Sequence, residues 1–366
     1  MSDREPTPQH RRGPVAPTCV IAAGTQTAPG GELSLQAACT WAASEFGSDA
    51  LVYAPKVLRF ATLPPGPRYV RIGRLRALLT ELADLRGGSQ VYLGMGDRLP
   101  LVSRATTKVL VLQNANIYAR HGSDVPLSRR AQYGAQRWWA ARSVRRADRV
   151  VTSTATAAHL AVSSLGAGAE KVHVIPIPPI DVVAPRSTQP ETIGTIALIG
   201  EARANKRFAW ALGEISAWSA TREAAVRVVH VGMVPDTEEG RAVRDAAAAM
   251  ANGSCELRGT LPHAEAMRVL ADADLLVLAS RLESHGIPLS EAMASCVPVV
   301  CSDIPAFRDV GGAAPRFFSG ADGTLAAAIE GVEPAAVRDA MAAGGLALVP
   351  GDGAWRLLEE GERLHA

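Results

Sequence analysis

Short apolar segments alternate with helical segments along most of this 366-residue chain, and this alternation limits the fold more than any other feature. In the first part of the chain the apolar segments lie at 19–23, 50–53, 90–93, 108–112, 149–152 and 171–175, and helical segments lie at 32–45, 71–85, 127–146 and 155–164. Short continuous apolar runs are typical of strands that are buried on both faces, as in a parallel sheet. The pattern therefore predicts a parallel sheet with helices on both faces.

A proline-rich segment at 176–190 interrupts the alternation, which then starts again. The second series predicts strands at 192–199, 227–231, 255–257, 275–278, 297–300 and 316–318, with helices at 207–219, 238–250, 264–271, 288–294 and 324–330. The chain is long enough for two domains, since a domain usually has about 100 to 200 residues. We therefore predict an α/β protein with two Rossmann-like, doubly wound domains at 18–182 and 183–350, facing across a cleft, after a disordered tail at 1–17.

Composition indicates a folded globular protein, with 48% apolar and 20% charged residues. The formal net charge of +2 argues neither for nor against binding to nucleic acid, so any charge argument must rest on local groups of residues. We expect no nucleic-acid partner. No apolar run reaches the roughly 18 residues of a membrane-spanning helix. The polar N-terminal segment lacks the apolar core of a secretory signal. Five scattered cysteines without Cys-x-x-Cys spacing favour a reducing cytoplasm over disulfides or a zinc site.

Two glutamates eight residues apart stand out in the second half of the chain. Glu283 falls in a loop that also contains a glycine and a proline, and Glu291 falls inside the helix that follows. Apolar runs at 274–280 and 297–303 flank this segment, so it forms a strand, loop, helix, strand unit. Ligands of open α/β sheets bind at the carboxyl ends of such strands, and a helix N-terminus there suits a phosphate. Because a facing phosphate would repel Glu291, we expect that carboxylate to accept hydrogen bonds from sugar hydroxyls.

Further elements follow the two glutamates in order: Pro298-Val299-Val300, Ser302-Asp303, Pro305 and Asp309-Val310-Gly311-Gly312. Together they resemble the C-terminal signature of glycosyltransferase family 4, whose members are retaining enzymes with the GT-B fold and nucleotide-sugar donors. The resemblance implies that Glu291 binds the donor ribose and that Glu283 lies against the transferred sugar. It also implies that the backbone of Ser284, His285, Gly286 and Ile287 meets the diphosphate. In proteins of this fold a last helix, here within 351–366, packs back on the first domain.

Two residues depart from the pattern of the family. His285 stands where the family usually has an aromatic residue, and Cys296 stands where it usually has glycine. Either residue is able to alter the sugar pocket without removing the nucleotide site. We expect His285, rather than Glu283 itself, to set the donor preference.

The loop after the strand at 192–199 is expected to supply positive charge. The resemblance implies a glycine–arginine pair here and a lysine some residues later, both directed at the donor diphosphate. Gly200 and Lys206 match this pattern, but Glu201 takes the place of the arginine, and Arg203 is the nearest substitute. Cations are needed because the leaving diphosphate gains negative charge and GT-B enzymes use no bound metal. Surface cations on a solvated loop are the alternative interpretation, mainly for Arg203.

Candidate residues in the first half carry weaker signals. Gly30 and Gly31 resemble the glycine pair with which family members bring backbone close to the donor phosphate and the acceptor, although a simple turn explains them equally well. Four polar residues are candidate contacts of the acceptor: Asp97, Asn114, Asn116 and His121. An Asp-Arg turn explains the first of these as well, and a lone histidine is more often structural or exposed.

The helix predicted near the middle of the chain is strongly basic. Between Ser128 and Arg149 it carries seven arginines, Trp138 and Trp139, with Asp148 as its single acid. Basic residues beside aromatic residues suit a helix that lies on an anionic membrane surface, which would make the chain a peripheral protein on the inner face of the membrane. The alternative is a helix that packs its tryptophans on the core and exposes its arginines.

These observations favour a retaining, metal-independent glycosyltransferase of polysaccharide biosynthesis. It would move a hexosyl-type sugar from a nucleotide diphosphate sugar to a hydroxyl of a glycan, a lipid-linked glycan or a small molecule, without a cofactor. The resemblance implies that the leaving phosphate deprotonates the acceptor, while Arg203 or Lys206 and the helix N-terminus stabilise the charge. Two alternatives stay open: a GT-B sugar-nucleotide epimerase or hydrolase that uses Glu283 and Glu291 as acid and base, and a nucleotide-sugar-binding protein without turnover.

Overall fold

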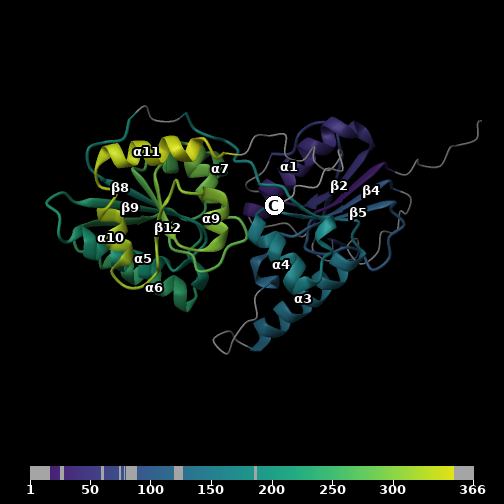
Figure 1. Cartoon of the computed structure of the whole chain (residues 1–366), viewed down its shortest axis with the longest axis horizontal. Helices are drawn as coiled ribbons and strands as arrows, with labels where there is room; N and C mark the ends of the chain where they lie inside the picture. The colour runs from purple at the N-terminus through teal and green to yellow at the C-terminus, as the bar shows by residue number, and fades with distance from the viewer. Residues whose placement is uncertain are drawn as a thin grey trace, which may run out of the picture.

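The structure is a computed structural model that describes residues 17–24, 29–58, 62–73, 76–77, 79, 89–118, 127–184 and 188–349. Two parallel sheets, one in each half of the chain, are covered by helices (Figure 1). This arrangement confirms the predicted α/β class with two Rossmann-like units. The predicted tail, apart from Pro17, and the predicted last helix lie outside the described residues.

The first sheet has seven parallel strands in the order β3-β2-β1-β4-β5-β6-β7. Its strands are β1 (Cys19–Ala22), β2 (Ala50–Pro55), β3 (Arg68–Ile72), β4 (Val91–Gly94), β5 (Thr107–Val111), β6 (Arg149–Thr152) and β7 (Val172–Val174). The helices described in this half include α1 (Pro29–Glu45), α3 (Leu127–Arg146) and α4 (Ala155–Leu165). The strand order is that of a doubly wound sheet, in which the direction of strand addition reverses between β1 and β4.

The second sheet has six parallel strands in the order β10-β9-β8-β11-β12-β13. Its strands are β8 (Thr195–Ile199), β9 (Val226–Val231), β10 (Gly253–Leu257), β11 (Leu275–Leu278), β12 (Val299–Ser302) and β13 (Arg316–Phe318). Its helices are α5 (Phe208–Ser219), α6 (Glu238–Ala248), α7 (His263–Ala271), α8 (Ile287–Ala294), α9 (Pro305–Gly311), α10 (Thr324–Glu330) and α11 (Ala335–Leu346). Here the reversal lies between β8 and β11.

Alternate residues of a strand point to opposite faces of the sheet, and this places α8. On β8, Leu198 belongs to a buried cluster with Leu212 of α5, whereas its neighbour Ala197 belongs to the cluster that contains Leu289 and Met293 of α8. Burial of a leucine or methionine side chain contributes about 1.5–3 kcal/mol. The apolar face of α8 therefore fixes the helix against the sheet, and the rest of the helix is oriented by that contact.

The edge strand β3 is the main departure from the elements expected from the sequence. The helix predicted at 71–85 starts too early, because Arg71 and Ile72 complete β3. Arg68 and Arg71 are exposed, and charges on an edge strand obscure the apolar alternation by which a strand is recognised. The sequence prediction also missed two helices, α9 and α11.

Candidate functional site

Strand order alone indicates where the second sheet binds a ligand. In a doubly wound sheet the ligand crevice opens at the carboxyl ends of the two strands between which the order reverses. Those strands are β8 and β11, so the loop at 200–206 and the loop at 279–286 lie side by side. The backbone N–H of Arg281 donates to the Asn205 carbonyl at 2.8 Å, and the Asn205 side-chain amide donates to the Leu282 carbonyl at 3.2 Å. These bonds fix the two loops together.

Lys206 and Glu283 form an ion pair between the two loops. Lys206 Nζ lies 2.5 Å from Glu283 Oε1, although the two residues are 77 positions apart in the sequence. Their side chains are only 18% and 14% exposed, so Lys206 is not the solvated surface cation of the alternative interpretation. Lys206 also lies over Gly200, where an added Cβ would be 3.6 Å from its Cε. The structure thus brings three of the predicted site residues together.

Arg203 and Glu201 pair with each other instead of joining this contact. Arg203 Nη2 lies 2.5 Å from Glu201 Oε2, and the Arg203 side chain is 59% exposed. Exposed ion pairs contribute little stability, about 0–1 kcal/mol, so the pair is easily exchanged for another partner. In this structure, however, Glu201 neutralises the charge that was predicted to substitute for the missing arginine.

The N-terminus of α8 is built around Gly286. This residue has a φ of +88°, and an added Cβ would lie 2.5 Å from Cε1 of Phe307. No side chain caps the helix, and Pro288 occupies its first turn. The first N–H groups of a helix have no partners within the helix and carry its positive dipole end, which suits an anion. The loop that leads to Ile287 therefore presents a backbone site for a phosphate next to Lys206 and Glu283.

Ser284 and His285 connect this loop to the first half of the chain. The Ser284 carbonyl accepts hydrogen bonds from Ser153 Oγ at 3.3 Å and from Thr154 Oγ1 at 3.2 Å. His285 is 3% exposed, with its Nδ1 at 3.3 Å from the Ser153 carbonyl. Burial lowers the pKa of His285 to about 4, so the ring is neutral near pH 7 and Nδ1–H is the donor. Its expected role in donor preference stays a prediction.

Glu291 is anchored by a histidine that the sequence prediction missed. The Glu291 side chain is buried, and its Oε1 lies 2.8 Å from Nε2 of His263. His263 Nδ1 lies 2.9 Å from Oδ2 of Asp181, in the segment between the two sheets. A signal was present in the sequence, because His263 opens the helix after β10, at the same edge of the sheet as the two glutamates.

Cys296 has a φ of +54°, a left-handed conformation that glycine adopts without steric cost. This explains why glycine is the usual residue at a position of this kind. The Cys296 carbonyl accepts a hydrogen bond from the Gln189 side-chain amide at 3.0 Å.

The candidate residues of the first half are placed less completely. Gly30 and Gly31 lie in the first turn of α1, which begins at Pro29 and not after the glycines. Asp97, with a φ of +59°, accepts the backbone N–H groups of Gln113 at 2.6 Å and Asn114 at 3.2 Å. It thereby ties together the loops after β4 and β5.

Two further candidates are not described at the level of side chains. The side chain of Asn116 and the whole of His121 lie outside the described residues, so their predicted acceptor contacts stay predictions.

Helix α3 uses only part of its basic surface inside the fold. Arg137 donates to the carbonyls of Ile117, Tyr118 and Ser164, and Arg146 donates to the Pro100 carbonyl. The Trp139 indole N–H donates to the Leu99 carbonyl, whereas the Trp138 side chain is 62% exposed. Over the part of the chain that the structure describes, no helix combines the length and the hydropathy needed to cross a bilayer.

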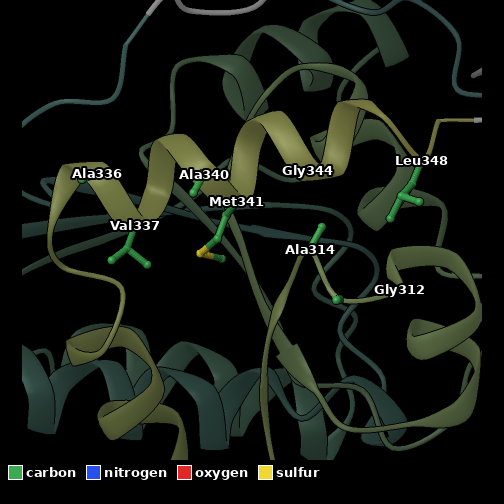
Figure 2. A pocket seen from close by; sticks show the side chains of 9 residues that line it. Gly312, Ala314, Ala336, Val337, Ala340, Met341, Gly344 and Leu348 are labelled. Atoms are coloured by element: carbon green, nitrogen blue, oxygen red, sulfur yellow. The ribbon is translucent and has the colours of Figure 1, made fainter.

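An apolar groove elsewhere in the second half lacks the chemistry for a nucleotide. It has a volume of about 700 Å³ and lies between α11 and the loop at 312–314. Figure 2 shows the side chains of Val337 and Met341 of α11 on the side of the helix where Ala314 lies. Its lining residues are apolar or glycine, so no side chain there can bind a diphosphate. Among the described residues no group of three metal-ligating side chains lies close enough to hold an ion.

Comparison with known proteins gives one family match and several matches to the fold. Residues 193–344 match the family model described as Glycosyl transferases group 1. No curated protein is significantly similar to the chain in sequence.

Three solved structures, each 13% identical to the chain, superpose on it with a TM-score of 0.68. Sucrose-phosphate synthase from Thermosynechococcus elongatus covers 93% of this chain and 96% of its own. The match to HepE from Anabaena, solved with UDP and glucose, covers 93% of this chain and 98% of HepE. WaaG, a glycosyltransferase involved in lipopolysaccharide biosynthesis, covers 94% and 100%. This likeness confirms the predicted GT-B fold.

Proposed function

We propose that the chain, which has the GT-B fold and matches the Glycosyl transferases group 1 model over residues 193–344, is a retaining, metal-independent enzyme of glycosyltransferase family 4. It would transfer a hexosyl-type sugar from a nucleotide diphosphate sugar to a hydroxyl acceptor. The observation that carries the proposal is the Lys206–Glu283 ion pair beside the N-terminus of α8. The complex of HepE with UDP and glucose supports the choice of a nucleotide sugar.

In the proposed mechanism, the diphosphate lies against the N–H groups at the start of α8 and replaces Glu283 as the partner of Lys206. Glu283, released from the lysine, orients the hydroxyls of the sugar. The bond between the anomeric carbon and the phosphate oxygen breaks, and the acceptor oxygen bonds to the same face of the sugar. The acceptor proton passes to the leaving phosphate. Preorganised N–H groups and a cation stabilise the charge that develops there.

The hydrolase and epimerase alternatives are less well supported by these contacts. Glu283 accepts from the Lys206 ammonium and Glu291 accepts from His263. A general acid must hold a proton that it can donate to the leaving group. Glu291, which keeps its contact with His263 in the proposed mechanism, is poorly placed for that role, so the two glutamates do not form an acid and base pair.

Donor binding tests the site. We expect the protein to bind one class among UDP-, GDP-, ADP- and dTDP-sugars, and Glu291→Ala to weaken that binding at least about tenfold, because a hydrogen bond to a charged group contributes about 1.5–3 kcal/mol. Calorimetry on the apo protein measures it, with Glu238→Ala, an exposed glutamate of α6, as the matched control. Unchanged affinity in Glu291→Ala would disprove the site. Binding without transfer to any acceptor would favour the non-catalytic alternative.

For the acceptor, we propose a lipid-linked glycan reached from an anionic membrane surface through α3. Leu127 and Trp138 are 74% and 62% exposed, and Arg142 and Arg145 are exposed beyond them on the same helix. We expect the protein to co-sediment with vesicles that contain anionic lipid at low salt, because cations near such a surface contribute about 1 kcal/mol each. The variant Trp138→Ala/Arg142→Gln/Arg145→Gln should remain in the supernatant. Absence of co-sedimentation by the wild type would remove this proposal.

A further inference from the structure

A buried histidine between two carboxylates lies next to the candidate donor site. His263 opens α7 and is 8% exposed. Its Nε2 lies 2.8 Å from Glu291 Oε1 and its Nδ1 lies 2.9 Å from Asp181 Oδ2. Glu291 belongs to α8, whereas Asp181 belongs to the segment between the two sheets. The histidine therefore joins three separate parts of the chain.

The two contacts determine the charge of the ring. A neutral imidazole has one N–H donor and one bare acceptor nitrogen, but each nitrogen of His263 faces a carboxylate oxygen that can only accept. Both nitrogens are satisfied only when both carry protons. Burial alone lowers the pKa of His263, but hydrogen bonds and charges from Glu291 and Asp181 outweigh burial, so the pKa is raised. Over the part of the chain that the structure describes, these two are the charged groups that act on the ring, and both are acidic.

Stability alone does not account for this arrangement. Buried ion pairs often add little net stability over apolar residues of similar size, because both charges lose their hydration. The neighbouring positions of α8, Leu289, Ala292 and Met293, show that this helix packs well through apolar side chains. Glu291 has its Oε1 bound to His263, and its Oε2 has no partner among the described residues. One carboxylate oxygen is thus anchored while the other is available to a ligand.

We propose that His263 is a positioning residue for the donor: as an imidazolium it orients the Glu291 carboxylate toward the ribose hydroxyls and links it to Asp181. The inference rests on the proposed function in assigning Glu291 to the donor. Asp181 would act on the far side of the ring, where it fixes the ring plane and supplies the acceptor for Nδ1–H. At metal sites a histidine ligand is oriented in the same way, by donating its second ring N–H to a carboxylate or a carbonyl.

Donor affinity in single and double variants tests the link. We expect His263→Gln to weaken nucleotide-sugar binding about tenfold with little change in kcat, because the glutamine keeps one donor but loses the charge. In a Glu291→Gln background, His263→Gln should not weaken donor binding any further, since the effects of two residues that act through one contact do not add. His159→Asn, at an exposed histidine of α4, is the matched control. Additive losses would overturn the proposal, because they would mean that His263 does not act through Glu291.

The pH dependence gives a second readout. Wild-type donor affinity should fall as the pH rises through the raised pKa of His263, because the neutral ring cannot donate to both carboxylates. His263→Gln should show no such fall. Should His263→Gln fail to fold, Asp181→Asn provides a milder change at a side chain that is 48% exposed. It should lower the pKa of His263, as measured by NMR titration of the imidazole without donor, and weaken donor binding.

The outcomes separate this inference from the proposed function. A wild-type protein that binds no nucleotide sugar would overturn both. A wild-type protein that binds a donor with an affinity that is flat over the titration of His263 would overturn only the role of His263.

Discussion

Lys206→Met should lower kcat about 100- to 1,000-fold, the usual cost of removing one preorganised charge-stabilising group from a transition state. In the structure Lys206 is mostly buried and pairs with Glu283 between the loops at 200–206 and 279–286, while Arg203 is exposed and paired with Glu201. Methionine keeps much of the length and apolar volume of the lysine side chain, so the loop at 200–206 should keep its conformation. The measurement is the initial rate of nucleoside diphosphate release at saturating donor and acceptor.

A matched ion pair in the first sheet provides the control. Lys108 of β5 lies 3.8 Å from Asp148, and its side chain is 21% exposed, close to the 18% of Lys206. Lys108→Met should leave kcat within about twofold, since surface substitutions away from a site are nearly neutral. Arg203→Met should lower kcat less than about tenfold if Lys206 is the main cation that stabilises the leaving phosphate. An Arg203→Met loss larger than that of Lys206→Met would reverse the assignment.

Gly286→Ala should lower the free energy of unfolding by about 2–5 kcal/mol, from two sources. A left-handed conformation costs a residue with a Cβ about 1–2 kcal/mol. Overpacking costs about 1–3 kcal/mol more, because the new methyl group would lie 2.5 Å from the ring of Phe307, which is 1% exposed and cannot move aside. Urea unfolding monitored by circular dichroism measures the change.

Two companion variants separate these sources. Gly213, in the middle of α5, has nothing within 4 Å of an added Cβ, so Gly213→Ala should stabilise the protein by about 0.5–1 kcal/mol. Adding Phe307→Leu to Gly286→Ala should recover part of the stability lost by overpacking, but not the stability lost by the left-handed backbone conformation. A Gly286→Ala variant as stable as the wild type would mean that the start of α8 does not have the conformation described.

Patterns local in the sequence predicted the framework of the site, and contacts between distant segments supplied the rest. Strand, loop and helix signals located Glu283 and Gly286 at the end of a strand, and the family resemblance assigned roles to them and to Lys206. The strand order then places the three residues together. The bond between His263 and Asp181 spans 82 positions, and no periodicity or spacing in the chain indicates it. The same limit applies to Arg203, whose spacing suggested a free cation. Its pairing with Glu201 depends on side-chain rotamers that a sequence pattern does not specify.

The bonds that join the two halves have a consequence for movement. Ser153 and Thr154 hold the Ser284 carbonyl, the Ser153 carbonyl holds His285, and the Thr156 N–H donates to Asp309 of α9. Three of these four bonds end on the loop that leads into α8. A rigid rotation that separates the halves therefore has to break hydrogen bonds of this loop or move the loop with the first half. In the proposed mechanism this loop leads to the phosphate, so a movement that separates the two halves would also alter the proposed phosphate contact.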